Sequence, residues 1–172
     1  MTTPTSAPVG QFGVYTVQMG GCAACGQSVA ALRAPIYAAG LAARGVRFVQ
    51  SPRHADIVIL TGALTNAGLD PLKELLAGIP EPHALVAVGD CAITGGVFQG
   101  SPDLVPNPAE ALDVHVEIAG CPPAPEAILA ALAEATALLA QRETPAEPET
   151  ERQSADDETH DDSDDEREGR DA

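Results

Sequence analysis

The sequence predicts an α/β protein built on a doubly wound, parallel sheet in a single domain. Apolar runs rich in Val and Ile alternate along the chain with Ala- and Leu-rich segments, as strands alternate with helices in such folds. Two of the runs, Asp56–Thr61 and Leu85–Val88, are almost continuously apolar, which is typical of strands covered on both faces. The length of 172 residues suits one domain of this class.

Each expected element has a local signal. A Val- and Tyr-rich run predicts a first strand over Phe12–Met19, and the Ala- and Leu-rich segment Ser28–Arg44 predicts a helix that Pro35 bends or splits. The pair Asp70-Pro71 is typical of an N-cap and a first helical residue, so we expect a helix from there to about Ala77. The remaining expected elements are strands at Val46–Gln50, Asp56–Thr61, Leu85–Val88 and Val114–Ile118, and a last long helix over Pro122–Gln141.

Negative charge is concentrated at one end of the chain. The formal net charge is -16, and residues 142–172 contain fourteen acids, four arginines and few apolar residues. Such a segment buries too little apolar surface to offset its ordering entropy, so we expect a disordered acidic tail over 142–172. An acidic arm that docks on a basic partner is the alternative. Residues 1–10 are expected to be a flexible N-terminus, which leaves 11–141 as the folded domain.

Composition argues against several classes of partner. The acidic charge and the scarcity of aromatic residues disfavour nucleic-acid binding. No run approaches the roughly 20 apolar residues of a membrane span, and Met1–Gly10 lacks the basic start and apolar run of a secretory signal. We therefore expect the chain to remain in the cytoplasm, where cysteines serve metal or redox chemistry more often than disulfides.

All four cysteines lie in glycine-containing turns. Cys22 and Cys25 form a C-x-x-C pair after the first expected strand, and Cys91 and Cys121 each follow a later strand. Because ligands of open parallel sheets bind beyond the carboxyl ends of the strands, we expect the four thiols to meet at one edge of the sheet. Glycine beside each cysteine lets the backbone approach closely and exposes N–H groups to sulfur.

Four thiolates suit either a zinc ion or a [4Fe–4S] cluster. Four-cysteine zinc sites usually come as two close pairs, whereas this chain has one close pair and two distant single cysteines, which favours a cluster. A zinc-stabilised binding domain remains an alternative, as does a thioredoxin-like redox pair at Cys22 and Cys25. No loop has the Ser/Thr-rich phosphate cradle of an FMN site. None of the histidines, which are His54, His83, His115 and His160, has partners at the spacing of metal ligands. Only His54 is a mild candidate for a metal ligand.

A set of motifs, in order from about residue 11 to 140, resembles the small cluster-carrying subunit of respiratory complex I (the 20 kDa subunit of NADH-quinone oxidoreductase) and its relative, the small subunit of [NiFe] hydrogenases. The last of them, Gly-Cys-Pro-Pro-x-Pro-Glu, is the most specific. The motifs are Gly21-Cys22-Ala23-Ala24-Cys25, Ser51-Pro52-Arg53-His54-Ala55-Asp56, Thr61-Gly62, Gly89-Asp90-Cys91-Ala92 with Gly95-Gly96-Val97-Phe98, and Gly120-Cys121-Pro122-Pro123-Ala124-Pro125-Glu126.

The resemblance implies a flavodoxin-like domain that holds one [4Fe–4S] cluster on Cys22, Cys25, Cys91 and Cys121, with no catalytic residue of its own. It implies an electron-transfer subunit next to the catalytic site of a large subunit, either a hydrogenase large subunit or a relative of the complex I 49 kDa subunit. With the other subunits of such a membrane-associated complex, the chain would lie peripherally on the inner face of the cell membrane.

The spacing of the first two cysteines separates the branches of this family. The small cluster-carrying subunit of complex I usually has two adjacent cysteines there, whereas this chain has the C-x-x-C of hydrogenase small subunits and lacks their additional cysteines. It therefore looks most like the complex I-related membrane-bound hydrogenases of the formate hydrogenlyase type. A complex I-type NADH-quinone oxidoreductase subunit that passes electrons to quinone is the alternative.

Six further residues are expected around the cluster. Arg53 is expected to place positive charge near the cluster and raise its potential, with a loop-anchoring salt bridge as the alternative. Asp90 is expected either to relay protons or to cap the turn that follows it. The other four are neighbours of the cysteines: Gly21, Gly89, Gly120 and Pro122.

Overall fold

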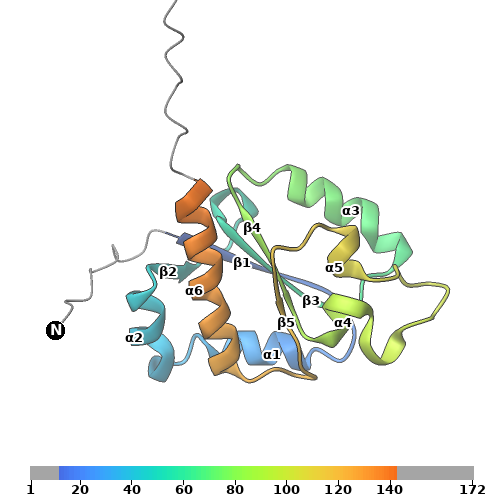
Figure 1. Cartoon of the computed structure of the whole chain (residues 1–172), viewed down its shortest axis with the longest axis horizontal. Helices are drawn as coiled ribbons and strands as arrows, with labels where there is room; N and C mark the ends of the chain where they lie inside the picture. Colours follow the sequence, from blue (N-terminus) through green and yellow to red (C-terminus); the bar gives the residue numbers. More distant parts are fainter. Residues whose placement is uncertain (1–11, 143–172) are drawn as a thin grey trace, which may run out of the picture.

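A parallel sheet forms the centre of the computed structural model, which describes residues 12–142 (Figure 1). Its five strands lie in the order β2-β1-β3-β4-β5, and every neighbouring pair is parallel. This is the strand order of flavodoxin-like folds, so the expected doubly wound α/β fold is confirmed. The strands are β1 (Phe12–Gly20), β2 (Val46–Phe48), β3 (Ile57–Gly62), β4 (Ala84–Val88) and β5 (Val116–Ile118).

Helices cover both faces of the sheet (Figure 1). The first, second and last helices pack on one face, and α3 packs on the other. The helices are α1 (Ala24–Ala31), α2 (Pro35–Ala43), α3 (Asn66–Ala77), α4 (Asp90–Thr94), α5 (Pro108–Ala111) and α6 (Pro125–Arg142), with single 3-10 turns η1 (Pro52–His54) and η2 (Gly96–Phe98).

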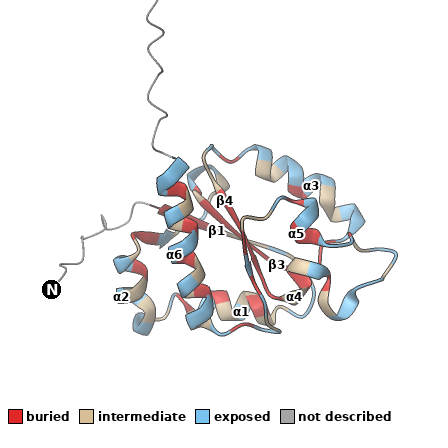
Figure 2. Cartoon of the chain, in the orientation of Figure 1, coloured by how far each residue is buried: buried red, intermediate tan, exposed pale blue. Residues whose placement is uncertain are grey.

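The central strands are buried on both faces, as their apolar runs predict. Every residue of Ile57–Leu60 in β3 and of Val86–Val88 in β4 is at most 1% exposed. Alternate side chains of β3 enter the two hydrophobic cores, with Ile57 and Ile59 on the α6 side and Val58 and Leu60 on the α3 side. Figure 2 shows the buried residues concentrated on these strands. Packing on both faces of the sheet therefore fixes the positions of the strand ends.

The helix expected over Ser28–Arg44, with a bend or a split at Pro35, is split: α1 ends at Ala31, and Pro35 is the first residue of α2. The expected start at Ser28 is wrong, because α1 begins at Ala24. Ala23 adopts a left-handed backbone (φ 65°) that turns the chain into the helix directly after the Cys22 turn. Of the first cysteine pair, Cys22 therefore lies in a loop and Cys25 lies in a helix.

The expected start of α3 at Asp70 is also wrong. Thr65 is the N-cap, and its Oγ1 accepts a hydrogen bond from the Gly68 backbone N–H at 3.1 Å. This cap satisfies a donor of the first turn, so the helix begins before the Asp-Pro pair and Pro71 lies inside it. The last helix begins at Pro125 instead of Pro122, because a proline suits the first helical position while the two preceding prolines belong to the Cys121 turn.

The expected flexible N-terminus (1–10) and all but the first residue of the expected acidic tail (142–172) lie outside the described residues; Arg142 itself ends α6. Between Phe12 and Arg142, none of the helices has the length and apolar character needed to cross a membrane.

Candidate metal centre

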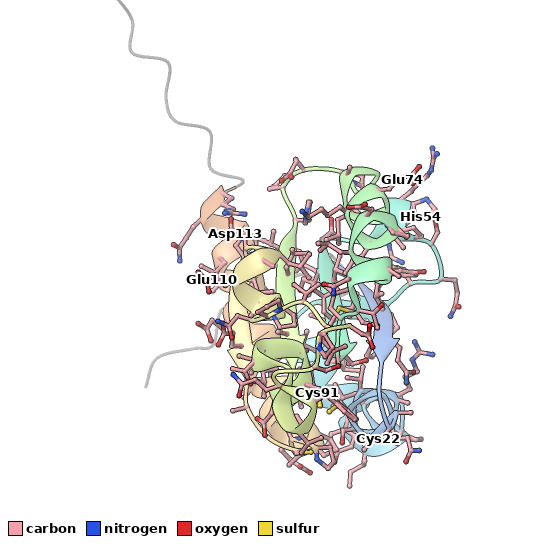
Figure 3. All side chains as sticks on the ribbon, turned by 90° about the vertical axis from the view of Figure 1, so that its right-hand side faces the viewer. Cys22, His54, Glu74, Cys91, Glu110 and Asp113 are labelled. Atoms are coloured by element: carbon pink, nitrogen blue, oxygen red, sulfur yellow. The ribbon has the colours of Figure 1, made fainter. Side chains whose placement is uncertain are left out.

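A pocket at the carboxyl edge of the sheet is lined by all four cysteines. It contains about 370 Å³ of space between atoms, part of it open to solvent. Cys22 and Cys25 follow β1, Cys91 follows β4 and Cys121 follows β5. In Figure 3, Cys22 and Cys91 lie together at one end of the molecule, and His54 lies near the other. The structure therefore gathers thiols from three strand ends.

Two of the thiols are buried and two are exposed. Cys25 and Cys91 lie in the first turns of α1 and α4, and each is 9% exposed. Cys22 and Cys121 lie in turns and are exposed. All four are free thiols. A group bound by the set would therefore have two inner ligands and two ligands at the protein surface.

The electrostatics of the buried thiols reflect their shared location. Burial is the main cause that raises the pKa of Cys25, and the charges of Cys91, Cys121 and Cys22 raise it further. Burial likewise raises the pKa of Cys91, followed by the charge of Cys121. Both thiols are therefore protonated at neutral pH, and a bound metal centre would release protons as it binds the thiolates.

The turn after α4 supplies a donor to sulfur. A hydrogen bond from the Val97 backbone to Cys91 lowers the pKa of that thiol, against the effect of burial. The same donor favours the thiolate form that binds a metal. Hydrogen bonds of this kind to ligand sulfurs also tune the potential of iron–sulfur centres.

Gly89 lets the end of β4 pass directly against the Cys25 sulfur. Its φ is 92°, and a Cβ at this position would overlap Cys25 Sγ. The Gly89 N–H donates to the Ile118 carbonyl oxygen at 2.8 Å, which continues the β4–β5 pairing into the turn. Only glycine satisfies this backbone and this approach together.

The remaining expected residues divide into two groups. Gly21, Asp90 and Gly120 line the pocket, and Pro122 follows Cys121 directly in an exposed turn. Asp90 accepts a hydrogen bond from the Gly120 N–H at 2.7 Å. Arg53 is not brought to the thiols: it lies in η1, before the amino end of β3, and is exposed. His54, beside it, is also exposed and distant from the cysteines (Figure 3).

The donor set fits an iron–sulfur cluster. It consists of four thiols, a backbone N–H directed at one of the sulfurs, and a glycine whose missing side chain leaves room for another. Within residues 12–142, no three His, Cys, Asp or Glu side chains lie close enough together to hold a single metal ion. The thiols thus surround a shared space without converging on one point.

Two exposed apolar residues lie beside this site, and from the sequence they were named only as part of a motif, without a role. Val97 is 80% exposed and Phe98 is 43% exposed, and both lie in η2, which follows the short helix carrying Cys91. A Cβ on Gly21 would lie 3.9 Å from the Phe98 ring, so η2 borders the Cys22 turn. In the sequence they form a Val-Phe pair between Gly96 and Gln99, which is too short to indicate a strand or a helix.

Comparison with known proteins identifies the family of this chain. Residues 22–135 match the family model described as NADH ubiquinone oxidoreductase, 20 Kd subunit. A probable membrane-bound hydrogenase subunit of Pyrococcus furiosus is 40% identical over 116 residues, which cover 67% of this chain and 68% of that protein. Formate hydrogenlyase subunit 7 of Escherichia coli is 36% identical over 129 residues, 75% of this chain and 50% of that one.

A solved structure supports the fold. A chain of the membrane-bound sulfane sulfur reductase, an archaeal respiratory membrane complex, matches with a TM-score of 0.64 and 25% identity. The match covers 78% of this chain and 73% of that chain. Together with the sequence relatives, it confirms the resemblance deduced from the cysteine motifs.

Proposed function

This chain belongs to the family of the 20 kDa subunit of NADH ubiquinone oxidoreductase, and from that premise we propose that it is an electron-transfer subunit carrying one [4Fe–4S] cluster. By family it is an oxidoreductase subunit. We propose Cys22, Cys25, Cys91 and Cys121 as the four ligands. The observation that supports this most directly is the single pocket that all four thiols line.

The chain's own residues supply position and environment. When bound, the cluster would accept and release single electrons, and no other group of the chain is needed for bond chemistry. Cys25 and Cys91 would hold its inner side, and Val97 would donate a hydrogen bond to the Cys91 sulfur. The exposed Cys22 and Cys121 would leave its outer side accessible to a redox partner.

We propose that this partner is the large catalytic subunit of a hydrogenase-like complex, seated over the outer thiols and η2. Two relatives are named as a probable membrane-bound hydrogenase subunit and as a subunit of formate hydrogenlyase. The exposed Val97 and Phe98 provide apolar surface beside the pocket, as an interface core requires. The complex would hold the chain peripherally at the inner face of the cell membrane, through its other subunits.

A complex I-type subunit that passes electrons to quinone is the second candidate, since the matching family model carries that enzyme's name. The C-x-x-C pair favours the hydrogenase branch. Nickel in the large subunit that copurifies with this chain would support the hydrogenase assignment, and a nickel-free large subunit that reduces quinone would support the other.

Anaerobic reconstitution with iron and sulfide tests the cluster. We expect about four iron and four sulfide per chain and an EPR signal after reduction. Cys91→Ala and Cys121→Ser should remove the signal or change it, whereas Thr136→Ala in α6, outside the thiol pocket, should not. A reduced wild-type chain without a cluster signal, together with an unaffected Cys121→Ser variant, would refute the proposal.

The two alternative functions of the thiols, a zinc site and a redox pair, predict different experimental results. A zinc-stabilised domain predicts about one zinc and no iron in protein purified without oxygen. A thiol–disulfide enzyme predicts activity in a variant that keeps only Cys22 and Cys25, and indifference to the loss of Cys91.

The partner surface is tested by a matched pair of substitutions. Val97→Asp should abolish copurification with the large subunit, because it puts a charge into the centre of the proposed interface. Ile36→Asp is the control, since Ile36 is equally prominent at 81% exposure but lies at the start of α2 and outside the thiol pocket. Loss of the complex in both variants, or in neither, would contradict the proposed surface.

A further inference from the structure

We propose that Asp90 is a positioning residue that fixes the Cys121 turn against the helix carrying Cys91. The role deepens the function proposed above and rests on it, since it concerns two of the four ligands. It assigns the Asp90 carboxylate to a structural hydrogen bond instead of proton relay or capping of its own helix.

Asp90 and Gly120 exchange two hydrogen bonds. The Gly120 backbone N–H donates to Asp90 Oδ1 at 2.7 Å, and the Asp90 backbone N–H donates to the Gly120 carbonyl oxygen at 3.1 Å. Each residue directly precedes a cysteine, Cys91 in one case and Cys121 in the other. The exchange therefore ties together the backbones of two ligands that are far apart in the sequence.

The carboxylate is directed to the neighbouring turn and not to its own helix. The N-cap of α4 is Gly89, and no side chain caps this helix. Gly120 takes a φ of 137°, and a Cβ there would lie 2.9 Å from Pro123 Cα, so the tight turn accommodates only glycine. Its N–H needs an acceptor from outside the turn, and Asp90 provides one.

The same exchange occurs at the opposite end of the sheet. The Gly13 N–H donates to Asp56 Oδ2 at 2.6 Å, and the Asp56 N–H donates to the Gly13 carbonyl oxygen at 2.8 Å. This pair ties β1 to the start of β3 and has no cysteine beside it. It is therefore an internal control with the same chemistry and no contact with the thiols.

Three substitutions separate the hydrogen bond of Asp90 from its charge. Asp90→Asn keeps an oxygen acceptor and removes the charge. Asp90→Glu keeps the charge but moves the carboxylate by one methylene, and Asp90→Ala leaves the Gly120 N–H without its acceptor. Asp56→Ala removes the equivalent acceptor at the other end.

Loss of iron to a chelator measures how firmly the site is held in the full-length reconstituted chain. We expect Asp90→Ala and Asp90→Glu to lose the cluster roughly tenfold faster than wild type, because an unpaired donor is disfavoured by about that factor. Asp90→Asn and Asp56→Ala should stay within about twofold of wild type, since the acceptor is kept in one and the thiols are untouched in the other.

Hydrogen exchange of the Gly120 amide tests the bond without any cluster. In the metal-free chain, this amide should be protected in wild type and Asp90→Asn and should exchange freely in Asp90→Ala. A wild-type chain that binds no iron refutes the cluster, and the exchange data still decide whether the Asp90–Gly120 bond exists. The positioning role is overturned by a freely exchanging wild-type amide, by an Asp90→Ala variant that keeps its cluster as long as wild type, or by an Asp90→Asn variant that loses it as fast as Asp90→Ala.

Discussion

The two ends of the sheet are held by the same pair of hydrogen bonds, yet only one end carries chemistry. At the amino end, Asp56 and Gly13 join the starts of β1 and β3, which continue as regular parallel strands. At the carboxyl end, Asp90 and Gly120 join two turns, and a cysteine follows each. The exchange itself is therefore a general way of tying neighbouring strands. What distinguishes the carboxyl end is that the chain leaves the sheet there, so side chains and N–H groups are free to face a common space.

The largest expected effect comes from filling the space at the carboxyl end. Gly89→Ala should destabilise the metal-free fold by about 3 kcal/mol and prevent cluster loading, because it adds steric overlap with Cys25 Sγ to the strain of a backbone with positive φ. Gly100→Ala is the control: its φ is 86°, and no heavy atom lies within 4 Å of the added Cβ. It should cost only the strain, about 1–2 kcal/mol. Urea denaturation measures both, and equal losses of stability would show that the contact with Cys25 is unimportant.

The second largest effects are expected from removing the two aspartates, Asp56 at the amino end and Asp90 at the carboxyl end. Asp56→Ala and Asp90→Ala should each lower the free energy of unfolding of the metal-free chain by about 2 kcal/mol, because each leaves a backbone N–H without its charged acceptor. The double variant should show the sum to within about 0.5 kcal/mol, since the two pairs lie at opposite ends and share no partner. A double variant much more stable than the sum would mean that the ends are coupled.

The sequence predicted which residues lie at the carboxyl end of the sheet better than which residues lie at the amino end. Cysteine spacing and glycine turns predict where the thiols gather, because parallel strands present their carboxyl ends at one edge. The position of Arg53 was not predictable in this way. The motif that contains Arg53 lies between the first and second cysteine motifs in the sequence. However, the chain passes from β2 into β3 at the amino end of the sheet, and this places Arg53 far from the thiols.

Hydrogen-bond partners were the least predictable part. Asp90 is adjacent to Cys91 in sequence, which suggested a local cap or a proton relay, whereas its partner Gly120 is reached only through the pairing of β4 with β5. The helix start at Thr65 was missed for a related reason: a threonine cap competes with an Asp-Pro signal five residues later, and the sequence alone does not rank them. Fold class follows from periodicity, while such contacts depend on packing.

The amino end contains a titratable residue whose effect on stability should be seen in acid. His115 lies just before β5, and its Nδ1 accepts a hydrogen bond from the Leu85 N–H at 2.9 Å. Burial is the main cause that lowers the pKa of His115. Of the charged groups around it, Arg142 and His83 lower this pKa further, while Asp113 and Glu81 raise it.

Because the pKa of His115 is lower in the folded chain than in the unfolded chain, the unfolded chain binds the proton more readily. The stability linked to this residue is complete above the unfolded pKa of about 6.5 and falls as the pH decreases below it. His115→Asn, which keeps an acceptor near the position of Nδ1, should make Tm less sensitive to pH between about 7 and 5. Identical pH profiles of wild type and His115→Asn would contradict the assignment.

The smallest effect should come from an exposed hydrogen bond between α2 and the start of α6, the helix that follows the Cys121 turn. Tyr37 Oη donates to Glu126 Oε1 at 2.7 Å, and this bond raises the pKa of Tyr37 and lowers that of Glu126. The stabilisation is therefore present above the unfolded pKa of the carboxyl and is lost as the pH falls through its folded pKa; on the alkaline side it is lost as the phenol ionises, above pH 10. Since solvent and salt weaken exposed contacts, Tyr37→Phe should lower Tm at neutral pH by less than Asp56→Ala and leave cluster loss to a chelator unchanged. If Tyr37→Phe instead speeds that loss as much as Asp90→Ala, the Cys121 turn is held through α6 as well, and the bond to Asp90 is not its main support.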